Sequence, residues 1–179
     1  MTPSVVFWVA GLVLALLLGA VWLFRRKGSA ERRSRPPELA RADLVYMEET
    51  FRTGGPLWMV AKVDRVYRLP DGALVLVELK TRRRDRPYLT DIIQLSVQRL
   101  AVAAQTGASV EPYAFVSVLD TAGRLRSHRV HLLDLNEIAD LRRRRKGILD
   151  GQLRPAYATS EAACRQCALR HKCDRPRLS

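Results

Sequence analysis

The feature that most constrains the fold is a pair of apolar runs, "LWMVAKVDRVYRL" at 57–69 and "ALVLVELKT" at 73–81, separated by Pro70, Asp71 and Gly72. Both runs are rich in β-branched residues, which favour strands over helices. The three residues between them supply, in order, a fixed φ, a turn-forming side chain and tolerance of positive φ, as a three-residue hairpin loop requires. We therefore predict that the two runs form an antiparallel β-hairpin.

The loop also fixes which side chains of the hairpin lie opposite each other. Leu69 faces Ala73 across such a loop, and counting back from this pair places Asp64 directly opposite Glu78. Lys80 lies on the same face as Glu78 because side chains alternate along a strand. Opposed carboxylates destabilise a sheet unless a cation lies between them. The pattern therefore indicates a metal site, although an exposed aspartate and a Glu-Lys ion pair on a solvated face would give the same sequence.

Two carboxylates on adjacent strands can bind Mg²⁺, which takes a few protein oxygens and completes its coordination with water or phosphate. A metal held in this way activates water and stabilises charge on a phosphodiester, and a nearby lysine can orient the nucleophile. Asp64 followed by Glu78-x-Lys80 resembles the core of the PD-(D/E)XK nuclease superfamily. The resemblance implies a restriction-endonuclease-like α/β fold, a mixed β-sheet flanked by helices. It also implies that Asp64 and Glu78 hold Mg²⁺ or Mn²⁺ and that Lys80 assists the attacking water.

The helix expected after the hairpin extends the resemblance. In "DIIQLSVQRLA", Gln94 matches the glutamine of a Gln-x-x-x-Tyr motif in the RecB-like branch of the superfamily, which includes CRISPR-associated exonucleases. Gln98 occupies the tyrosine position, and Ala61 occupies a position that is often glycine. Gln94 and Gln98 share one helix face, so both can point to the strand site. The resemblance spans about residues 37–175, and it implies that Gln94 positions water or phosphate and that Gln98 contacts nucleic acid.

The net charge of the chain is +13, from 31 Lys and Arg residues against 18 Asp and Glu residues. This excess favours a polyanionic partner such as nucleic acid or an anionic membrane surface, although many basic proteins bind neither. We expect two basic runs to contact the phosphate backbone of DNA. The first contains Arg82, Arg83 and Arg84, and the second contains Arg142, Arg143, Arg144, Arg145 and Lys146.

The other elements of the expected domain are less sharply marked. Apolar spacing predicts a helix from residue 37 to about residue 51, in which Glu48 is an additional acidic candidate because some members of the superfamily contribute an acidic residue from their first helix. Two strands are expected at 112–120 and 124–133. A helix is expected at 134–146, ended by the glycine that follows it.

The N-terminal segment is uncharged at 5–24, long enough for a helix to cross the hydrocarbon core of a bilayer, and Arg25, Arg26 and Lys27 follow directly. The positively charged region that precedes the apolar run of a cleaved signal peptide is missing. We therefore predict an anchor at 1–27, a basic juxtamembrane linker at 28–36 and a nuclease-like domain at 37–179. Because basic residues stay on the cytoplasmic side, the protein would be a single-pass inner (cytoplasmic) membrane protein with its C-terminal domain in the cytoplasm.

The C-terminal motif at 164–173 contains Cys164, Cys167 and Cys173. In a cytoplasmic chain, closely spaced cysteines more often bind metal than form a disulfide. The motif resembles the closing segment of iron-sulfur members of the same nuclease branch, which use a fourth, upstream cysteine that this chain lacks. Three alternatives remain: an iron-sulfur cluster with a non-cysteine ligand, a Zn²⁺ site completed by His171, or a segment without metal.

These features together predict a membrane-anchored, metal-dependent DNA nuclease that acts on DNA ends or single strands. A catalytically inactive, membrane-tethered module that binds nucleic acid or metal is the main alternative, favoured by the absent tyrosine and fourth cysteine. A structural membrane protein whose basic domain binds lipid would explain the charge but not the opposed carboxylates.

Overall fold

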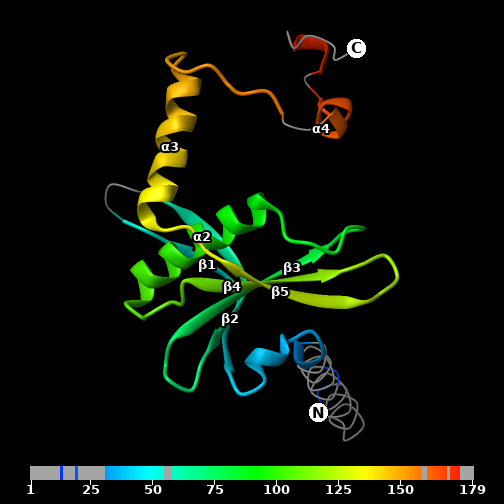
Figure 1. Cartoon of the computed structure of the whole chain (residues 1–179). Helices are drawn as coiled ribbons and strands as arrows, with labels where there is room; N and C mark the ends of the chain where they lie inside the picture. Colours follow the sequence, from blue (N-terminus) through cyan, green and yellow to red (C-terminus); the bar gives the residue numbers. More distant parts are fainter. Residues whose placement is uncertain are drawn as a thin grey trace, which may run out of the picture. The chain divides into compact units, whose positions relative to one another are not determined.

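The computed structural model describes residues 31–54, 58–158, 161–168 and 170–173, together with Val13 and Gly19. The chain divides into two compact units, Met1–Leu135 and Asn136–Ser179. The first unit contains η1 (Pro37–Leu39), β1 (Asp43–Arg52), β2 (Val60–Arg68), β3 (Leu74–Thr81), α2 (Leu89–Thr106), β4 (Tyr113–Leu119) and β5 (Leu125–His131). Figure 1 labels the five strands and α2. The second contains nearly all of α3 (Leu135–Leu149), with α4 (Glu161–Arg165) and η2 (Arg170–Lys172).

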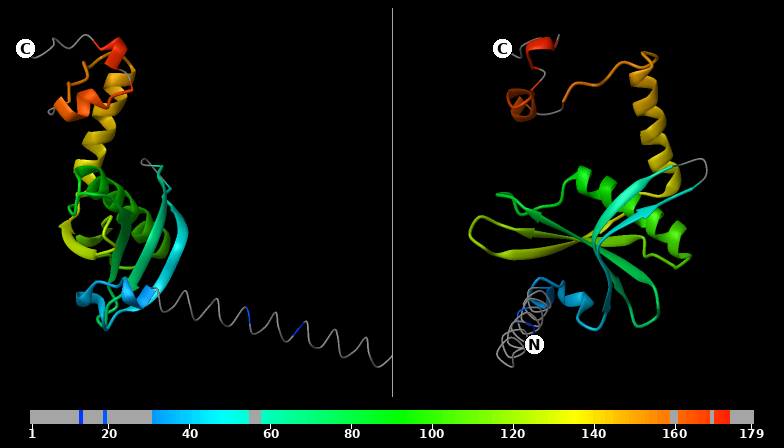
Figure 2. Two further views of the ribbon diagram at one scale, coloured as in Figure 1. Left: turned by 90° about the vertical axis from the view of Figure 1, so that its right-hand side faces the viewer. Right: turned by 180° about the vertical axis from the view of Figure 1, so that it is seen from behind.

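The first unit is built on one mixed sheet with the strand order β1-β2-β3-β4-β5. Neighbouring strands are antiparallel except for β3 and β4, which are parallel. A parallel pair needs a crossover connection, and α2 supplies it by passing across one face of the sheet (Figure 2). This sheet and its helix confirm the expected restriction-endonuclease-like α/β arrangement.

Alternation along β3 assigns its side chains to two cores. Leu74 and Leu76 face α2, where they pack in a cluster with Leu95 of that helix. Glu78 and Lys80 continue this register, so they face α2 as well. The intervening residues of β3 pack on the opposite face in a second cluster, where the segment before β1 covers the sheet. That cluster consists of Leu39, Ala42, Tyr67, Val75, Val77 and Phe115.

The predicted hairpin register is confirmed. The ladder between β2 and β3 runs from Arg68↔Leu74 to Arg65↔Val77. In every pair the two residue numbers have the same sum as those of Leu69 and Ala73, so the register is the predicted one. The Leu69 amide donates to the Ala73 carbonyl at 2.8 Å. Gly72 has a φ of 91°, which is the left-handed conformation that the third loop position requires.

The helix predicted over 37–51 is wrong. The structure has a short 3-10 turn at Pro37–Leu39 and then the ten-residue strand β1, which pairs with β2. The apolar residues of this segment suit either a helix face or an irregular strand. Backbone pairing with β2 favours the strand, and a local sequence pattern does not report that pairing.

The structure also corrects the expectation of a single-pass membrane protein. Across the residues that it describes, no helix is long and apolar enough to cross a membrane. The anchor predicted at 1–27 lies outside the described residues except for Val13 and Gly19. The longest described helix, α2, carries Asp91 and Arg99 and is amphipathic. The described residues therefore support the α/β part of the expected fold class, and they do not support the membrane helix or the inner-membrane localisation.

In the second unit, α3 continues past the glycine at which its end was expected. Gly147 is buried, and a Cβ placed on it would lie 2.8 Å from Leu153 Cδ1. The glycine therefore allows the chain that follows the helix to fold back against it, and helix α3 ends two residues later, at Leu149. The strands expected at 112–120 and 124–133 are confirmed as β4 and β5.

Candidate active site

The candidate site lies where β2 and β3 separate. The backbone ladder ends at Arg65↔Val77, one pair before Asp64 and Glu78. Beyond this point, Asp64 Oδ2 accepts a hydrogen bond from the Leu79 amide at 2.7 Å. The carboxylate thus replaces the missing strand partner, which holds Asp64 against the residue between Glu78 and Lys80.

Glu78 is 2% exposed, and its carboxylate is surrounded by donors. Oε1 accepts from Lys80 Nζ at 2.6 Å and from Gln94 Nε2 at 2.7 Å, while Oε2 accepts from Gln98 Nε2 at 3.0 Å. Lys80 Nζ also donates to Gln94 Oε1 at 3.0 Å, which closes a three-membered array. Burying a carboxylate is costly without such partners, so the array accounts for the charge in an apolar strand.

Asp64 is half-buried, and its pKa is raised above the ordinary value of 3.8. Burial is the largest cause, and the nearby carboxylates of Glu78 and Glu48 raise the pKa further, against the hydrogen bond from Leu79 and the charge of Lys80. A cation bound beside these carboxylates would offset the repulsion that raises the pKa.

Glu48 reaches this region from β1, not from the helix expected there. The pairs Met47↔Arg65 and Glu49↔Val63 place it across from Asp64, and it has a φ of 56°, the only positive φ of a non-glycine residue in the part of the chain that is described. Its side chain is exposed and forms an ion pair with Lys62.

Gln98 is placed differently from the prediction. A residue that contacts nucleic acid must be accessible, whereas Gln98 is 1% exposed. Its Nε2 donates to the Lys62 carbonyl at 2.8 Å as well as to Glu78. The helix face that points to the site was therefore predicted correctly, but the side chain of Gln98 is buried in the interior.

The first basic run is divided by the structure. Arg82 Nη2 donates to Asp91 Oδ2 at 2.8 Å, and both side chains are largely buried. The same Asp91 oxygen accepts from the Tyr88 amide at 2.8 Å at the start of α2. Arg82 therefore helps to fix the beginning of the helix, whereas Arg83 and Arg84 are exposed.

One cluster at this end of the sheet was missed by the sequence reasoning. Asp85 Oδ1 lies 2.7 Å from His128 Nε2, and Asp85 Oδ2 accepts from Arg126 Nη1 at 3.0 Å. The His128 hydrogen bond, and secondarily Arg126, hold the pKa of Asp85 below its usual range. The cluster ties the loop after β3 to β5. Asp85 is more than forty positions from Arg126 and His128 in the chain, so no local sequence pattern predicts these contacts.

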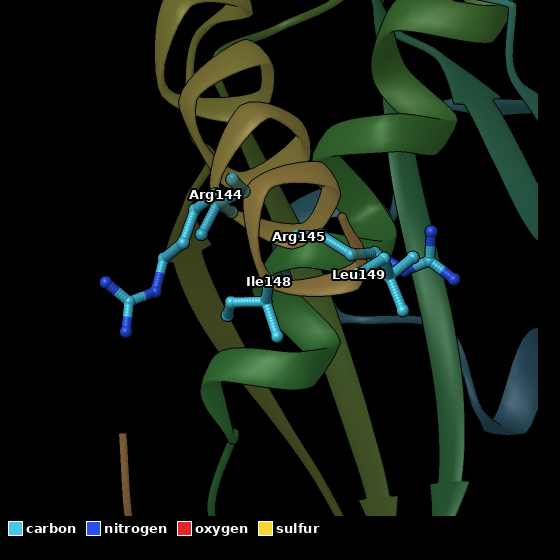
Figure 3. A pocket seen from close by; sticks show the side chains of 5 residues that line it. Arg144, Arg145, Ile148 and Leu149 are labelled. Carbon is cyan, nitrogen blue, oxygen red and sulfur yellow. The ribbon is translucent and has the colours of Figure 1, made fainter. Parts of the chain in front are cut away.

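The second basic run belongs to α3 in the other unit. Arg142, Arg143, Arg144 and Arg145 are exposed, and Arg143 forms an ion pair with Asp140. Figure 3 shows Arg144 and Arg145 on the same helix as Ile148 and Leu149. These side chains, with Leu141, line a shallow pocket along α3. The run is therefore an accessible basic surface with apolar residues beside it.

The C-terminal cysteines are thiols in the structure, with Cys164 half-buried and Cys167 and Cys173 exposed. The Cys167 amide donates to the Cys164 carbonyl at 3.3 Å, and His171 lies in η2. In the described ranges, no group of three His, Cys, Asp or Glu side chains is arranged to hold a metal ion. The metal at this motif stays a prediction.

The pair formed by Asp64 and Glu78 suits a different kind of metal site. Carboxylate oxygens are hard donors, which Mg²⁺ and Mn²⁺ prefer. Mg²⁺ is commonly bound by only one or two carboxylates and completes its coordination with water and substrate phosphate. Burial raises the pKa of Asp64 most, and the nearby carboxylates of Glu78 and Glu48 raise it further. The residues present therefore fit a divalent cation bound by two carboxylates.

The sheet is mixed, its crossover helix faces a strand with a Glu-x-Lys sequence, and the adjoining strand carries an aspartate. This combination defines the class of restriction-endonuclease-like α/β nucleases. The family model described as the PD-(D/E)XK nuclease superfamily matches residues 3–174. The chain belongs to this superfamily, which confirms the resemblance at that level.

One solved structure agrees with this fold, and a second has a lower similarity. A crystal structure of a protein called SSO0001 is similar with a TM-score of 0.50 and 17% sequence identity, over 89% of this chain and 70% of that protein. A candidate exonuclease from Eubacterium rectale gives a TM-score of 0.42 and 17% identity, over 78% of this chain and 58% of its own. At this identity the likeness to SSO0001 concerns the fold alone. The comparison with curated proteins gave no match.

Proposed function

We propose that the protein is a metal-dependent DNA nuclease of the RecB-like branch that hydrolyses phosphodiester bonds at DNA ends or in single strands. The observation that carries the proposal is the hydrogen-bonded array of Glu78, Lys80 and Gln94 beside Asp64. Membership of the nuclease superfamily supports the reaction class. The Gln94 position supports the branch.

In this proposal Asp64 and Glu78 hold Mg²⁺ or Mn²⁺, which when bound supplies Lewis-acid stabilisation of the phosphate and an activated water. Lys80 has three N–H bonds and directs two of them to Glu78 and Gln94. The third is available to a water or to the scissile phosphate. Lys80 therefore acts as a hydrogen-bond donor that orients the nucleophile and stabilises negative charge, and Gln94 fixes its direction.

The basic residues would bind the DNA backbone. Arg83 and Arg84 are exposed only three and four positions after Lys80, so they lie within reach of the same strand of nucleic acid. Arg82 and Asp85 anchor the two ends of this basic segment to α2 and β5. The arginines of α3 provide a second basic surface. Phosphate contacts of this kind supply affinity without reading sequence.

The test is cleavage of labelled single- and double-stranded DNA by the full chain with Mg²⁺, Mn²⁺ or a chelator. Wild-type protein is expected to cut in metal only, and Glu78→Gln to lose cleavage by orders of magnitude while DNA binding persists. Glu49→Gln is the matched control, because Glu49 is an exposed strand glutamate of β1. Folded wild-type protein that binds DNA but cuts no substrate would support the inactive binding module instead. Preference for RNA would overturn the substrate assignment.

A further inference from the structure

Gln98 joins the two strands at the point where their backbone pairing has stopped. The last pair of the ladder is Arg65↔Val77, and beyond it the Gln98 amide nitrogen donates to the Lys62 carbonyl of β2 and to Glu78 Oε2 of β3. An amide nitrogen has two hydrogens, and both are used here. The side chain therefore bridges the strands that carry the two metal-binding carboxylates.

Replacing this bridge with the tyrosine of the family motif would change the connection. A phenol has one O–H donor, so it can donate to only one of these two acceptors. The glutamine satisfies both while it is 1% exposed, and no described side chain has a buried polar atom without a partner. The departure from the motif is therefore a specific hydrogen-bonding solution and not a loss of contact.

The hydrogen bonds to Glu78 also fix the orientation of its carboxylate. A carboxylate has about four acceptor positions. Lys80 and Gln94 use two on Oε1, and Gln98 uses one on Oε2. One acceptor position on Oε2 is left for a cation. The hydrogen bond from Gln98 restricts rotation of the Glu78 carboxylate, so this position keeps its direction.

We propose that Gln98 is a positioning residue: it fixes the Glu78 carboxylate from its buried side and so sets the affinity of the Asp64–Glu78 pair for a divalent cation, without contacting nucleic acid. The proposal rests on the proposed function for the identity of that cation. Hydrogen bonds to metal-binding carboxylates orient these ligands and raise metal affinity.

The test uses the full chain and the variant Gln98→Met, which keeps the length of the side chain but removes both donors. Mn²⁺ is titrated calorimetrically in the absence of nucleic acid, and its dissociation constant is expected to rise about 10- to 100-fold. DNA affinity in chelator is expected to stay at the wild-type value, because Gln98 is buried. Turnover at saturating DNA should fall while the KM for DNA stays unchanged.

Gln105→Met is the matched control. Gln105 is another glutamine of α2, and its Oε1 accepts from the Arg52 amide at 2.8 Å, away from the carboxylates. This control should bind Mn²⁺ as tightly as wild type. If Gln98→Met does not fold, Gln98→Asn keeps the amide but is too short to reach both acceptors, and the same rise is expected.

Several outcomes would overturn the inference. They are an unchanged Mn²⁺ affinity in a folded Gln98 variant, a loss of DNA affinity without a loss of Mn²⁺ affinity, and no Mn²⁺ binding by the wild type. A wild type that binds Mn²⁺ in a Gln98-dependent manner but cuts no nucleic acid would refute the proposed function and leave the role of Gln98 standing.

Discussion

Removing the negative charge of Asp64 should change stability in opposite directions with and without metal. In Asp64→Asn, the amide oxygen can still accept the hydrogen bond from the Leu79 amide, so the strand connection survives. What disappears is a half-buried charge that burial and the carboxylates of Glu78 and Glu48 both disfavour. Without metal, the variant should therefore be at least as stable as the wild type.

The size of the effect follows from the exposure of the site. Because Asp64 is half-buried, solvent screens the repulsion, and we expect a gain of about 1 kcal/mol in chelator. For a chain of this size that corresponds to a rise in Tm of about 2–4 °C. With Mn²⁺ at about 100 times its dissociation constant, the wild type gains about 2.7 kcal/mol from binding, and the variant loses most of this gain. The order of the two melting temperatures should thus reverse.

The pH dependence has a definite sign. A carboxyl whose pKa is raised in the folded state contributes stability that is present below its ordinary value of 3.8 and is lost as the pH rises through the folded value. In chelator, the advantage of Asp64→Asn should therefore be full near neutral pH and shrink as the pH falls through the raised pKa of Asp64 and approaches 3.8.

The assay is thermal unfolding followed by circular dichroism, in chelator and in Mn²⁺, at several pH values. Asp43→Asn at the exposed start of β1 is the control and should show neither effect. A variant that melts several degrees below wild type in chelator would refute the reasoning, because Asp64 would then stabilise the metal-free fold. The same conclusion would follow if Mn²⁺ raised both melting temperatures equally.

Three further outcomes are expected. Lys80→Met should lower cleavage by orders of magnitude while Mn²⁺ binding persists, because the lysine is not a metal ligand; calorimetry and cleavage assays separate the two. Arg82→Gln should destabilise the protein by about 1–3 kcal/mol, because it removes the charged partner of the buried Asp91, whereas Arg83→Gln should leave the Tm unchanged and weaken DNA binding with a smaller dependence on salt. Metal analysis of anaerobically purified protein should find iron with acid-labile sulfide or one zinc at the 164–173 motif. If neither iron nor zinc is found, the motif lacks metal.

Local chemistry explains why part of the site could be predicted from the sequence. The Pro-Asp-Gly loop fixes the hairpin register, and strand alternation then assigns Glu78 and Lys80 to one face. The apolar spacing of α2 similarly directs Gln94 toward them. Each of these steps uses residues that are close in the chain, where backbone geometry and side-chain periodicity decide the outcome.

The sequence was misleading where the outcome depended on a distant partner. β1 has apolar spacing that suits a helix, but its backbone pairs with β2. The anchor expected at 1–27 is a separate case: it lies outside the described residues except for Val13 and Gly19, and no helix that the structure describes is long and apolar enough to cross a membrane.

The sequence by itself determined the hairpin, its register and the residues that gather around Glu78. Only the tertiary structure decided that Gln98 turns inward and that Arg82 is committed to Asp91. It also decided that Asp85 binds His128 on β5. The physical reason is that burial and the pairing of a polar group depend on which other segments pack against it, whereas register and periodicity are properties of the local chain.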